Sequence, residues 1–464
     1  NSLEGMRDLT LLILLILCSD LGAQELKNGR VEILNSRSVT VLRKDTTPIT
    51  ILRGDVILRN SDGIFKCDSA RWWRKQDRFK AFGNIHFIGD NGLTIQSEEL
   101  DYHQGIADLE GNVILKQDDQ ILEAPRLLYD TNNEIGSFND GGKVISNDGE
   151  LTATRGTYEA RNKLFLFRDK IRAITTDYII DCDIMKQYPE ESIYIIASDG
   201  TAKSESGELS FGSAHIDNKN NISSFFNGVI GKDLKMGFSA DSLYKMDHNE
   251  VTRLFGDSLN PAKWINFSND TMEIHSEFIN HTPELTIARN DVFTFQNKLI
   301  TNSENLSWNS KDSILILWEN ATTWSNNYQV ISDSLKYFFR NKRFKDSIYG
   351  TGRINLSSKP DSSVMTDEMA GKSLVGFLSN GQIETLIVKG NAAALIHPET
   401  DKSSNITCSE IELNFKENNL KSIRFIQAPQ GEIKGLESNV QHLPNYENRW
   451  TSYASRIDFM SGRK

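Results

Sequence analysis

The stretch GNIHFIGDNGLTIQSEELDYHQG, residues 83–105, is followed by a stretch that repeats its pattern, GNVILKQDDQILEAPRLLYDTNN, residues 111–133. Both begin with Gly-Asn and a β-branched residue, continue through polar residues, and end on a Leu followed by a Tyr. Almost no residue types that carry catalysis are kept between the copies. The two stretches therefore indicate a structural unit that is used repeatedly.

Two short phrases recur along the chain. The first is a Gly, a polar or small residue and alternating apolar residues, and its glycines Gly54, Gly83, Gly111 and Gly141 are 29, 28 and 30 residues apart. The second phrase is six residues long: a small residue, a polar residue, any residue, usually Leu or Ala, any residue, and an aromatic residue. Its copies include CDSARW (67–72), SEELDY (97–102), APRLLY (124–129), ATRGTY (153–158), SENLSW (303–308) and SDSLKY (332–337). A period near 29 residues is typical of stacked supersecondary units.

Each unit is predicted to be β-structure. Apolar and polar residues alternate in "NIHFIG" and "LTIQSE", and turn-forming residues such as 90–92 and 218–221 separate the alternating segments. We expect two or three short strands in each unit. Stacking them gives an all-β, solenoid-like stack of antiparallel strands with two facing sheets, whose inner faces come from alternate residues.

The alternation also selects the side chains that point inward. Matching positions of the two phrases form two apolar ladders, which either fill a closed core or line a groove that holds a lipid. The candidate lining residues are Val56, Leu58, Trp72, Ile85, Phe87, Tyr102, Val113, Leu115, Leu127, Tyr129, Val144 and Tyr158.

Composition and motifs argue against several classes of function. The 464-residue chain carries a net charge of −11, which argues against nucleic acid as a partner because phosphate binding needs a basic face. Cys67, Cys182 and Cys408 occupy the small position of the second phrase, so we interpret them as packing residues. The cysteines form no CxxC pair and the histidines no HExxH or HxH motif, so no metal and no cofactor is predicted.

The N-terminus resembles a secretory signal peptide. An apolar run from Leu11 to Leu17 follows Met6-Arg7, and residues 1–5 precede this methionine. The run is too short to span a bilayer, and cleavage is expected after Ala23. Lipidation at Cys18 is disfavoured because bulky Leu17 precedes it. We therefore predict an exported protein.

The phrases between Gly54 and Val144 resemble the OstA/LptA-like family, the periplasmic proteins of lipopolysaccharide transport. That family is marked by a "G-[DN]-V" strand followed by "A-D-x-L-x-Y" at a period near thirty, and the match is patchy beyond Val144 to about Phe415. The resemblance implies a twisted β-jellyroll, open along one side, that shelters lipopolysaccharide acyl chains without catalysis. It also implies a periplasmic location, partner jellyrolls at the inner and outer membranes, and end-to-end self-association.

The expected organisation has four parts. Residues 1–23 are the signal peptide, and 24–256 are OstA/LptA-like repeats with the best match at 50–160. Residues 257–430 continue as more divergent repeats with loop insertions around 257–275 and 358–370, and 431–464 form a C-terminal cap or partner-binding segment.

Two other functions fit a repetitive β-fold. A secreted carbohydrate-active enzyme needs a carboxylate pair, for which Asp181 with Asp183 and Glu98 with Glu99 are the candidates. Acidic residues recur at this place in most repeats, so we interpret them as solvated surface positions. The third class, a structural or adhesive solenoid, predicts the same fold with a closed, dry core.

Overall fold

The computed structural model describes residues 31–435 and Leu443, without the following turn and loop residues: 45–46, 60–62, 91, 118–119, 131, 147–148, 160, 163, 176–177, 189–190, 268–270, 297–298, 326, 340–344, 359–365, 380–381, 400–401 and 417–418. The predicted signal peptide, Cys18 and most of the predicted C-terminal segment lie outside the described residues.

The chain divides into two compact units. Unit 1 consists of Asn1–Gly231 with Tyr244–Asp247, and unit 2 of Lys232–Leu243 with His248–Lys464. The sequence also predicts that regular repeats give way to divergent ones at residue 256. That boundary concerns the spacing of the repeats and stays a prediction.

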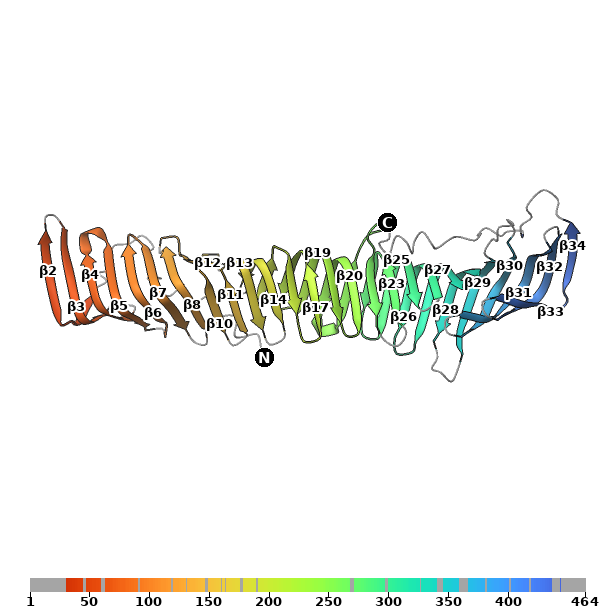
Figure 1. The fold of residues 1–464 in the computed structure, drawn as a ribbon, viewed down its shortest axis with the longest axis horizontal. Coiled ribbons are helices and arrows are strands. Elements are labelled where there is room, and N and C mark those ends of the chain that lie inside the picture. Colours follow the sequence, from red (N-terminus) through yellow and green to blue (C-terminus); the bar gives the residue numbers. More distant parts are fainter. Residues whose placement is uncertain are drawn as a thin grey trace. The chain divides into compact units, whose positions relative to one another are not determined.

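Unit 1 is built from strands, which follow one another in chain order in Figure 1. They are β1 (Glu32–Asn35), β2 (Ser38–Lys44), β3 (Thr47–Arg59), β4 (Gly63–Trp73), β5 (Arg78–Gly89), β6 (Thr94–His103), β7 (Ile106–Gln117), β8 (Gln120–Asp130), β9 (Ile135–Phe138), β10 (Gly142–Ser146), β11 (Gly149–Ala153), β12 (Arg155–Glu159), β13 (Leu164–Thr175), β14 (Ile179–Tyr188), β15 (Ile193–Ile196), β16 (Gly200–Lys203), β17 (Gly207–Phe211), β18 (Ser213–Asp217) and β19 (Ile222–Asp233), which ends just past the border of the unit.

Unit 2 continues in the same way. Its strands are β20 (Met236–Met246), which also crosses the border, β21 (Val251–Phe255), β22 (Ala262–Asn266), β23 (Met272–Ser276), β24 (Phe278–His281), β25 (Leu285–Gln296), β26 (Leu299–Asn309), β27 (Ile314–Ser325), β28 (Tyr328–Phe338), β29 (Asp346–Ser358), β30 (Glu368–Ser379), β31 (Gln382–Glu399), β32 (Lys402–Lys416), β33 (Asn419–Ile426) and β34 (Gln430–Gly435).

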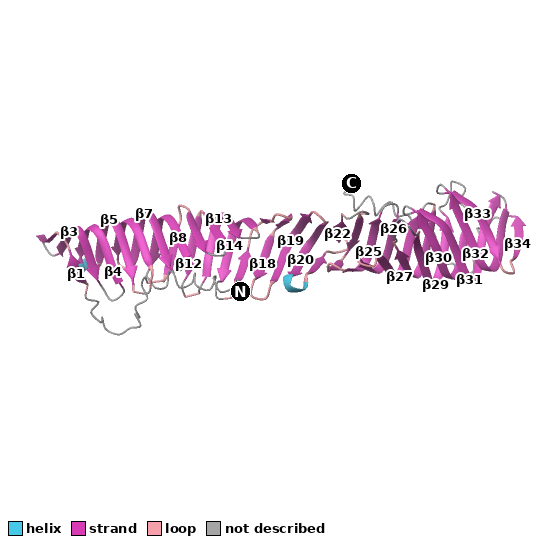
Figure 2. Cartoon of the chain, turned by 90° about the horizontal axis from the view of Figure 1, so that it is seen from below, coloured by secondary structure: helices cyan, strands magenta, loops and turns pink. Residues whose placement is uncertain are grey.

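The prediction of an all-β fold is confirmed. Strands make up nearly all of the chain that Figure 2 colours, and the helical residues among those described are two short 3₁₀ turns, Arg74–Gln76 and Asp247–Asn249. Neither turn approaches the length and apolar character that crossing a membrane requires. The strands pair antiparallel, mostly with the preceding and following strand in the chain.

Each long strand bends near its middle. In β5 the pairing with β6 is interrupted between Phe82 and Ile85, and the pairing with β4 between Phe82 and His86. Gly83 and Asn84, which lie in both gaps, have φ of 72° and 45°. Positive φ suits Gly and is tolerated by Asn, and two such residues in succession turn the strand sharply. We call the halves on the two sides of these bends wall 1 (residues 78–82 in β5) and wall 2 (residues 85–89).

The bend explains the first sequence phrase. Gly54-Asp55, Gly111-Asn112 and Gly390-Asn391 have the same pair of positive φ values. A Cβ atom at Gly83 would lie 2.2 Å from Asp68 Oδ2, and Asn84 Nδ2 donates a hydrogen bond to the same oxygen at 2.9 Å. Gly and Asn are therefore needed together, one for space and one for the hydrogen bond to the neighbouring strand.

The same corner hydrogen bond recurs in both units with changed residues. Asn112 Nδ2 donates to Glu98 Oε1 at 3.0 Å, and Asn290 Nδ2 donates to Glu277 Oε2 at 3.2 Å. At Asp169-Lys170 the glycine is lost, yet both residues keep positive φ, and the Lys170 N–H donates to Asp183 Oδ1 at 3.1 Å. The bend is thus kept at corners where the Gly-Asn motif is lost.

Two expectations need correction. In the best-matching region each repeat holds two bent strands of 10 to 13 residues, because each strand passes through both walls instead of ending at the corner. The loop insertion expected around 257–275 contains strand β22, which pairs with β20 and β23 and buries Trp264.

The two walls face each other across an apolar interior. In unit 1 the rings of Phe65 on wall 2 and Phe79 on wall 1 meet edge to face, with centroids 5.5 Å apart. In unit 2 the ring centroids of Trp264 on wall 2 and His281 on wall 1 are 5.0 Å apart. The core of each unit therefore sits between the halves of its own bent strands.

Candidate functional site

The inner face of wall 2 in unit 1 carries a continuous apolar row. Cross-strand pairing places its members directly opposite one another from β3 to β11, so each side chain touches the next. The row is Leu58, Phe65, Phe87, Ile95, Leu115, Leu122, Val144 and Leu151. Val56, Ile85 and Val113 lie one step closer to the corner, on the same face.

The inner face of wall 1 carries a row rich in aromatic rings. Pairing from β4 to β13 gives Trp72, Phe79, Tyr102, Ala107, Tyr129, Gly136, Tyr158 and Phe165 in order. Leu127 lies one step closer to the corner, opposite Leu109. The aromatic residues of the second sequence phrase thus occupy one row, as their recurrence every 27 to 30 residues implies.

The structure brings the twelve predicted lining residues together on the inner faces of the two walls. Buried members are Val56, Leu58, Ile85, Val113, Leu115, Leu127, Tyr129 and Tyr158. Half-buried members are Trp72, Phe87, Tyr102 and Val144. The half-buried group keeps some contact with solvent, although all four belong to the inner rows.

Sequence reasoning missed Phe65, Phe79, Ile95 and Leu122, which complete the same rows. Each lies two to four residues before a copy of one of the two phrases and therefore outside it. The available signal was the alternation itself: Phe65 and Cys67 are two residues apart and share a face, as do Phe79 and Ala81.

Tyr102 shows how the edge of the interior is built. Its hydroxyl donates a hydrogen bond to Asp77 Oδ2 at 3.4 Å, while its ring continues the wall 1 row. Burial of the ring, with help from the Asp77 charge, raises the pKa of the Tyr102 hydroxyl. The side chain therefore joins an apolar interior to a polar rim, a position that suits tyrosine.

The three described cysteines are buried and free, which fits their interpretation as packing residues. Cys67 Sγ donates to the Ser69 carbonyl at 3.4 Å, and Cys408 Sγ to the Glu410 carbonyl at 3.2 Å. Burial, with a contribution from adjacent aspartates, raises the pKa of Cys67 and of Cys182 to about 12. Such thiols stay protonated and are poor nucleophiles.

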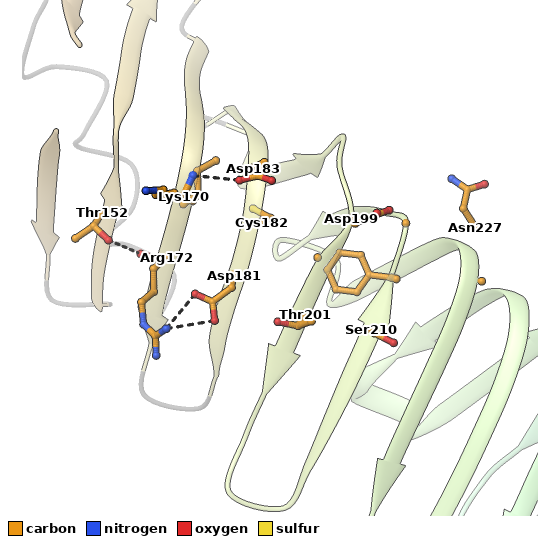
Figure 3. A pocket seen from close by; sticks show the side chains of 15 residues that line it. Thr152, Lys170, Arg172, Asp181, Cys182, Asp183, Asp199, Thr201, Ser210 and Asn227 are labelled. Atoms are coloured by element: carbon orange, nitrogen blue, oxygen red, sulfur yellow. Dashed lines mark hydrogen bonds and ion pairs between the residues drawn. The ribbon is translucent and has the colours of Figure 1, made fainter. Parts of the chain in front are cut away.

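The outer face of wall 2 in unit 1 has a shallow depression of about 780 Å³. Figure 3 shows its polar row, in which Arg172 Nη1 is 3.2 Å from Asp181 Oδ1, with Thr201 and Ser210 on the following strands. Asp183 accepts the Lys170 N–H at the corner. The acidic pair considered for catalysis therefore serves an ion pair and a strand bend at the surface.

Glu98 and Glu99, the other acidic pair, lie exposed on β6. Glu98 accepts the corner hydrogen bond of Asn112. Among the residues that the structure describes, no group of three or more His, Cys, Asp and Glu side chains is arranged to hold a metal ion.

Comparisons with known proteins give a match to one family. Residues 28–183 match the model of the family described as OstA-like protein. No curated protein matches the chain. Among solved structures, LptH from Pseudomonas aeruginosa, described as the LptA homologous periplasmic component of the conserved lipopolysaccharide transport device, is 13% identical. That likeness covers 24% of this chain and 80% of LptH, with a TM-score of 0.22.

A second solved structure, the WD40 domain of SCAP from fission yeast, is 10% identical over 79% of this chain and 97% of that domain, with a TM-score of 0.12. At these TM-scores neither structural likeness supports an argument about this chain. The family match coincides with the part of unit 1 that has the two inner rows and the most regular corners. By this match, residues 28–183 of the chain are similar to the OstA-like family.

Proposed function

We propose that unit 1 binds the acyl chains of lipopolysaccharide between its walls and carries this lipid across the periplasm towards the outer membrane, without catalysis. The observation that carries the proposal is the pair of facing apolar rows, one led by Leu58 and Phe87 and the other by Trp72 and Tyr102. Several of these side chains are only half-buried, so the rows offer apolar surface for a guest.

The energetics favour such a guest. Each CH₂ group taken from water into an apolar environment gains about 0.8 kcal/mol. The rows present a new pair of side chains at every strand spacing of about 4.8 Å, so an acyl chain would meet similar surface at each step. A lipid can then move along the rows without a deep energy minimum, and no chemical step is needed.

The edge of unit 1 supplies a surface for partner jellyrolls. Strands β1 and β2 both pair with β3, and the apolar side chains of Ile33, Val39 and Val41 are exposed. An edge strand with exposed apolar residues is a ready template for pairing with another sheet. We infer docking at this end to a related component of the transport bridge or to a second copy.

Photo-crosslinking in cells tests the proposal. A photoreactive amino acid at Phe87 should capture lipopolysaccharide, and the same group at Gln96 is the matched control. The two positions lie on adjacent strands of wall 2, but Gln96 is exposed on the outer face. Labelling at position 87 should exceed labelling at 96 by at least about tenfold, in line with a differential affinity of 1.4 kcal/mol or more.

Two results would contradict the proposal. Equal labelling at positions 87 and 96 would indicate a closed structural core without a guest. Labelling of position 87 by phospholipid alone would keep the groove but exclude lipopolysaccharide as its cargo.

A further inference from the structure

The outer face of wall 2 in unit 2 is buried where the pairing register predicts exposure. Val292 and Thr294 of β25 point to the interior, so Phe293 between them must point outward. Phe293 is nevertheless 0% exposed, and Trp324 of β27, on the same outer face, is 6% exposed. Their ring centroids are 6.2 Å apart.

Polar side chains extend this buried outer face to β30. Gln329 accepts a hydrogen bond from Trp324 Nε1 at 3.0 Å, and Ser357 and Glu368 follow on the next strands. All three are nearly inaccessible, with Glu368 only 1% exposed. In unit 1 the corresponding outer positions Gln96 and Glu123 are exposed. Another part of the molecule therefore covers this face in unit 2.

Leu443 identifies the cover. Its backbone N–H donates a hydrogen bond to Glu368 Oε2 at 3.0 Å, and the residue is itself only 4% exposed. Leu443 is eight residues beyond the end of β34, within the segment 436–464 that follows the last strand. A buried carboxylate oxygen that accepts a backbone N–H is a fixed anchor, because removing the donor would lose a hydrogen bond at a site that water does not reach.

The length and composition of the segment fit the face. From β30 back to β25 there are five strand spacings, about 24 Å in all. The 21 residues after Leu443 can reach about 70 Å when extended, well over this distance. They include Trp450, Tyr453, Ile457 and Phe459, which can cover Phe293 and Trp324.

We propose that the outer face of wall 2 in unit 2, from β25 to β30, is a docking surface whose occupant is the chain's own C-terminal segment, residues 436–464. Glu368 fixes the segment through the Leu443 N–H, and the aromatic pair Phe293 and Trp324 receives its apolar side chains. This surface lies outside the interior assigned to lipid, so the proposal stands independently of the proposed function.

Limited trypsin digestion of the purified chain tests the docking. Arg449 and Arg456 are cleavage sites within the segment, and a synthetic peptide of residues 436–464 gives the unprotected rate. In the intact chain we expect cleavage after Arg449 to be at least about tenfold slower than in the peptide. Glu368→Ala should remove most of this protection, whereas Glu368→Gln, which keeps an acceptor oxygen, should retain most of it.

Further variants separate docking from misfolding. Leu443→Pro deletes the N–H donor without changing any residue of strands β25 to β30, and it should accelerate cleavage as Glu368→Ala does. Glu384→Ala, which removes an ion pair with Lys345, is the control and should leave the rate unchanged.

Three outcomes would overturn the proposal. The first is cleavage of the intact chain at the peptide's rate, and the second is no effect of Leu443→Pro. The third is protection that rises with protein concentration, because the occupant would then be the segment of a second copy.

Discussion

The same phrase stands in both units, SEELDY at 97–102 and SDSLKY at 332–337, and the two copies have different surroundings. Their local geometry agrees, since Glu98 and Asp333 each accept a corner hydrogen bond from the following strand. Leu335 is 0% exposed, however, while the equivalent Leu100 is only partly buried. Tyr337 is likewise buried and Tyr102 is not. The phrase therefore fixes register and orientation, but it does not fix burial.

Burial of the phrase also varies within unit 1, where Leu127 and Tyr129 of the copy at 124–129 are buried. In unit 2, additional contacts join the free ends of the two walls. In unit 2 the Ile383 N–H on wall 1 donates to Ser325 Oγ on wall 2 at 3.3 Å, and both residues are buried. The Tyr328 ring on wall 2 meets Phe415 on wall 1, with centroids 5.1 Å apart. These contacts close the interior of unit 2 where they occur. Phe65 and Phe79 also meet across the walls in unit 1, but several side chains of its inner rows stay half-buried, and the proposed lipid is therefore assigned to unit 1.

Leucine truncation at the two equivalent positions should give the largest contrast. Leu335→Ala removes a fully buried side chain from a closed core and should lower the free energy of unfolding of unit 2 by about 3–5 kcal/mol. Leu100→Ala, at a half-buried site, should cost unit 1 about 1–2 kcal/mol. Denaturant titration followed by hydrogen exchange in β28 and in β6 measures the two losses. Equal losses would show that the interiors are packed alike.

Substitution at the corners should give equal effects in the two units. A Cβ atom at Gly83 or Gly352 would lie 2.2 Å from Oδ2 of Asp68 or Asp333, and both glycines have positive φ. We expect Gly83→Ala and Gly352→Ala each to cost about 2–3 kcal/mol, from backbone strain and a displaced hydrogen-bond acceptor. Gly228→Ala should cost only about 1 kcal/mol, because Gly228 has φ of 81° but no atom lies within 4 Å of the added Cβ. Thermal unfolding of the three variants checks this order. Unequal stability losses in Gly83→Ala and Gly352→Ala would mean that the two units do not share the same corner structure.

Acid should affect unit 2 through one outer-face carboxylate. His275 Nε2 and Lys263 Nζ each lie 2.5 Å from Glu273 Oε1, and the hydrogen bonds from His275 and Lys263 outweigh burial, so the pKa of Glu273 falls to about 2. Since this folded-state pKa lies below the ordinary 4.5, the stabilisation is complete above pH 4.5 and is lost as the pH falls towards 2. We expect a loss of about 2 kcal/mol over this range.

Glu273→Gln should remove this part of the acid sensitivity when unfolding is followed between pH 6 and pH 2.5. The matched control is Glu150→Gln in unit 1, whose partner Lys143 lies 2.7 Å away on the same face of wall 2. That pair is about one-third exposed, so its loss should change stability by less than about 0.5 kcal/mol. An unchanged pH profile in Glu273→Gln would exclude Glu273 as the source.

Much of the fold could be predicted because the repeat is local. The alternation that includes Ile85 and Phe87 predicted the inner face of wall 2. The recurrence of an aromatic residue at the end of the second phrase, as in Trp72 and Tyr102, predicted the row on wall 1. The Gly-Asn pairs marked the corners, although their bend and the resulting strand length could not be deduced from periodicity alone. Corners without glycine, such as Asp169-Lys170, gave no sequence signal.

The rest depends on contacts between residues far apart in the chain. Ser325 meets Ile383 across 58 residues, and Leu443 meets Glu368 across 75. A repeat pattern carries no information about such pairs, because each is made once and by residues outside the phrases. The closed interior of unit 2 and the covered outer face of its wall 2 were therefore beyond sequence reasoning.

The passage of single strands through both walls has a mechanical consequence for unit 1. Walls made from separate strands could slide or part, whereas each long strand here runs through both walls and bends at a corner such as Gly83-Asn84. Widening the space at one point would bend several neighbouring corners together, because their hydrogen bonds link each strand to the next. A cargo in this space would meet walls that resist widening at any one point, and it would travel lengthwise more easily than it could force the walls apart.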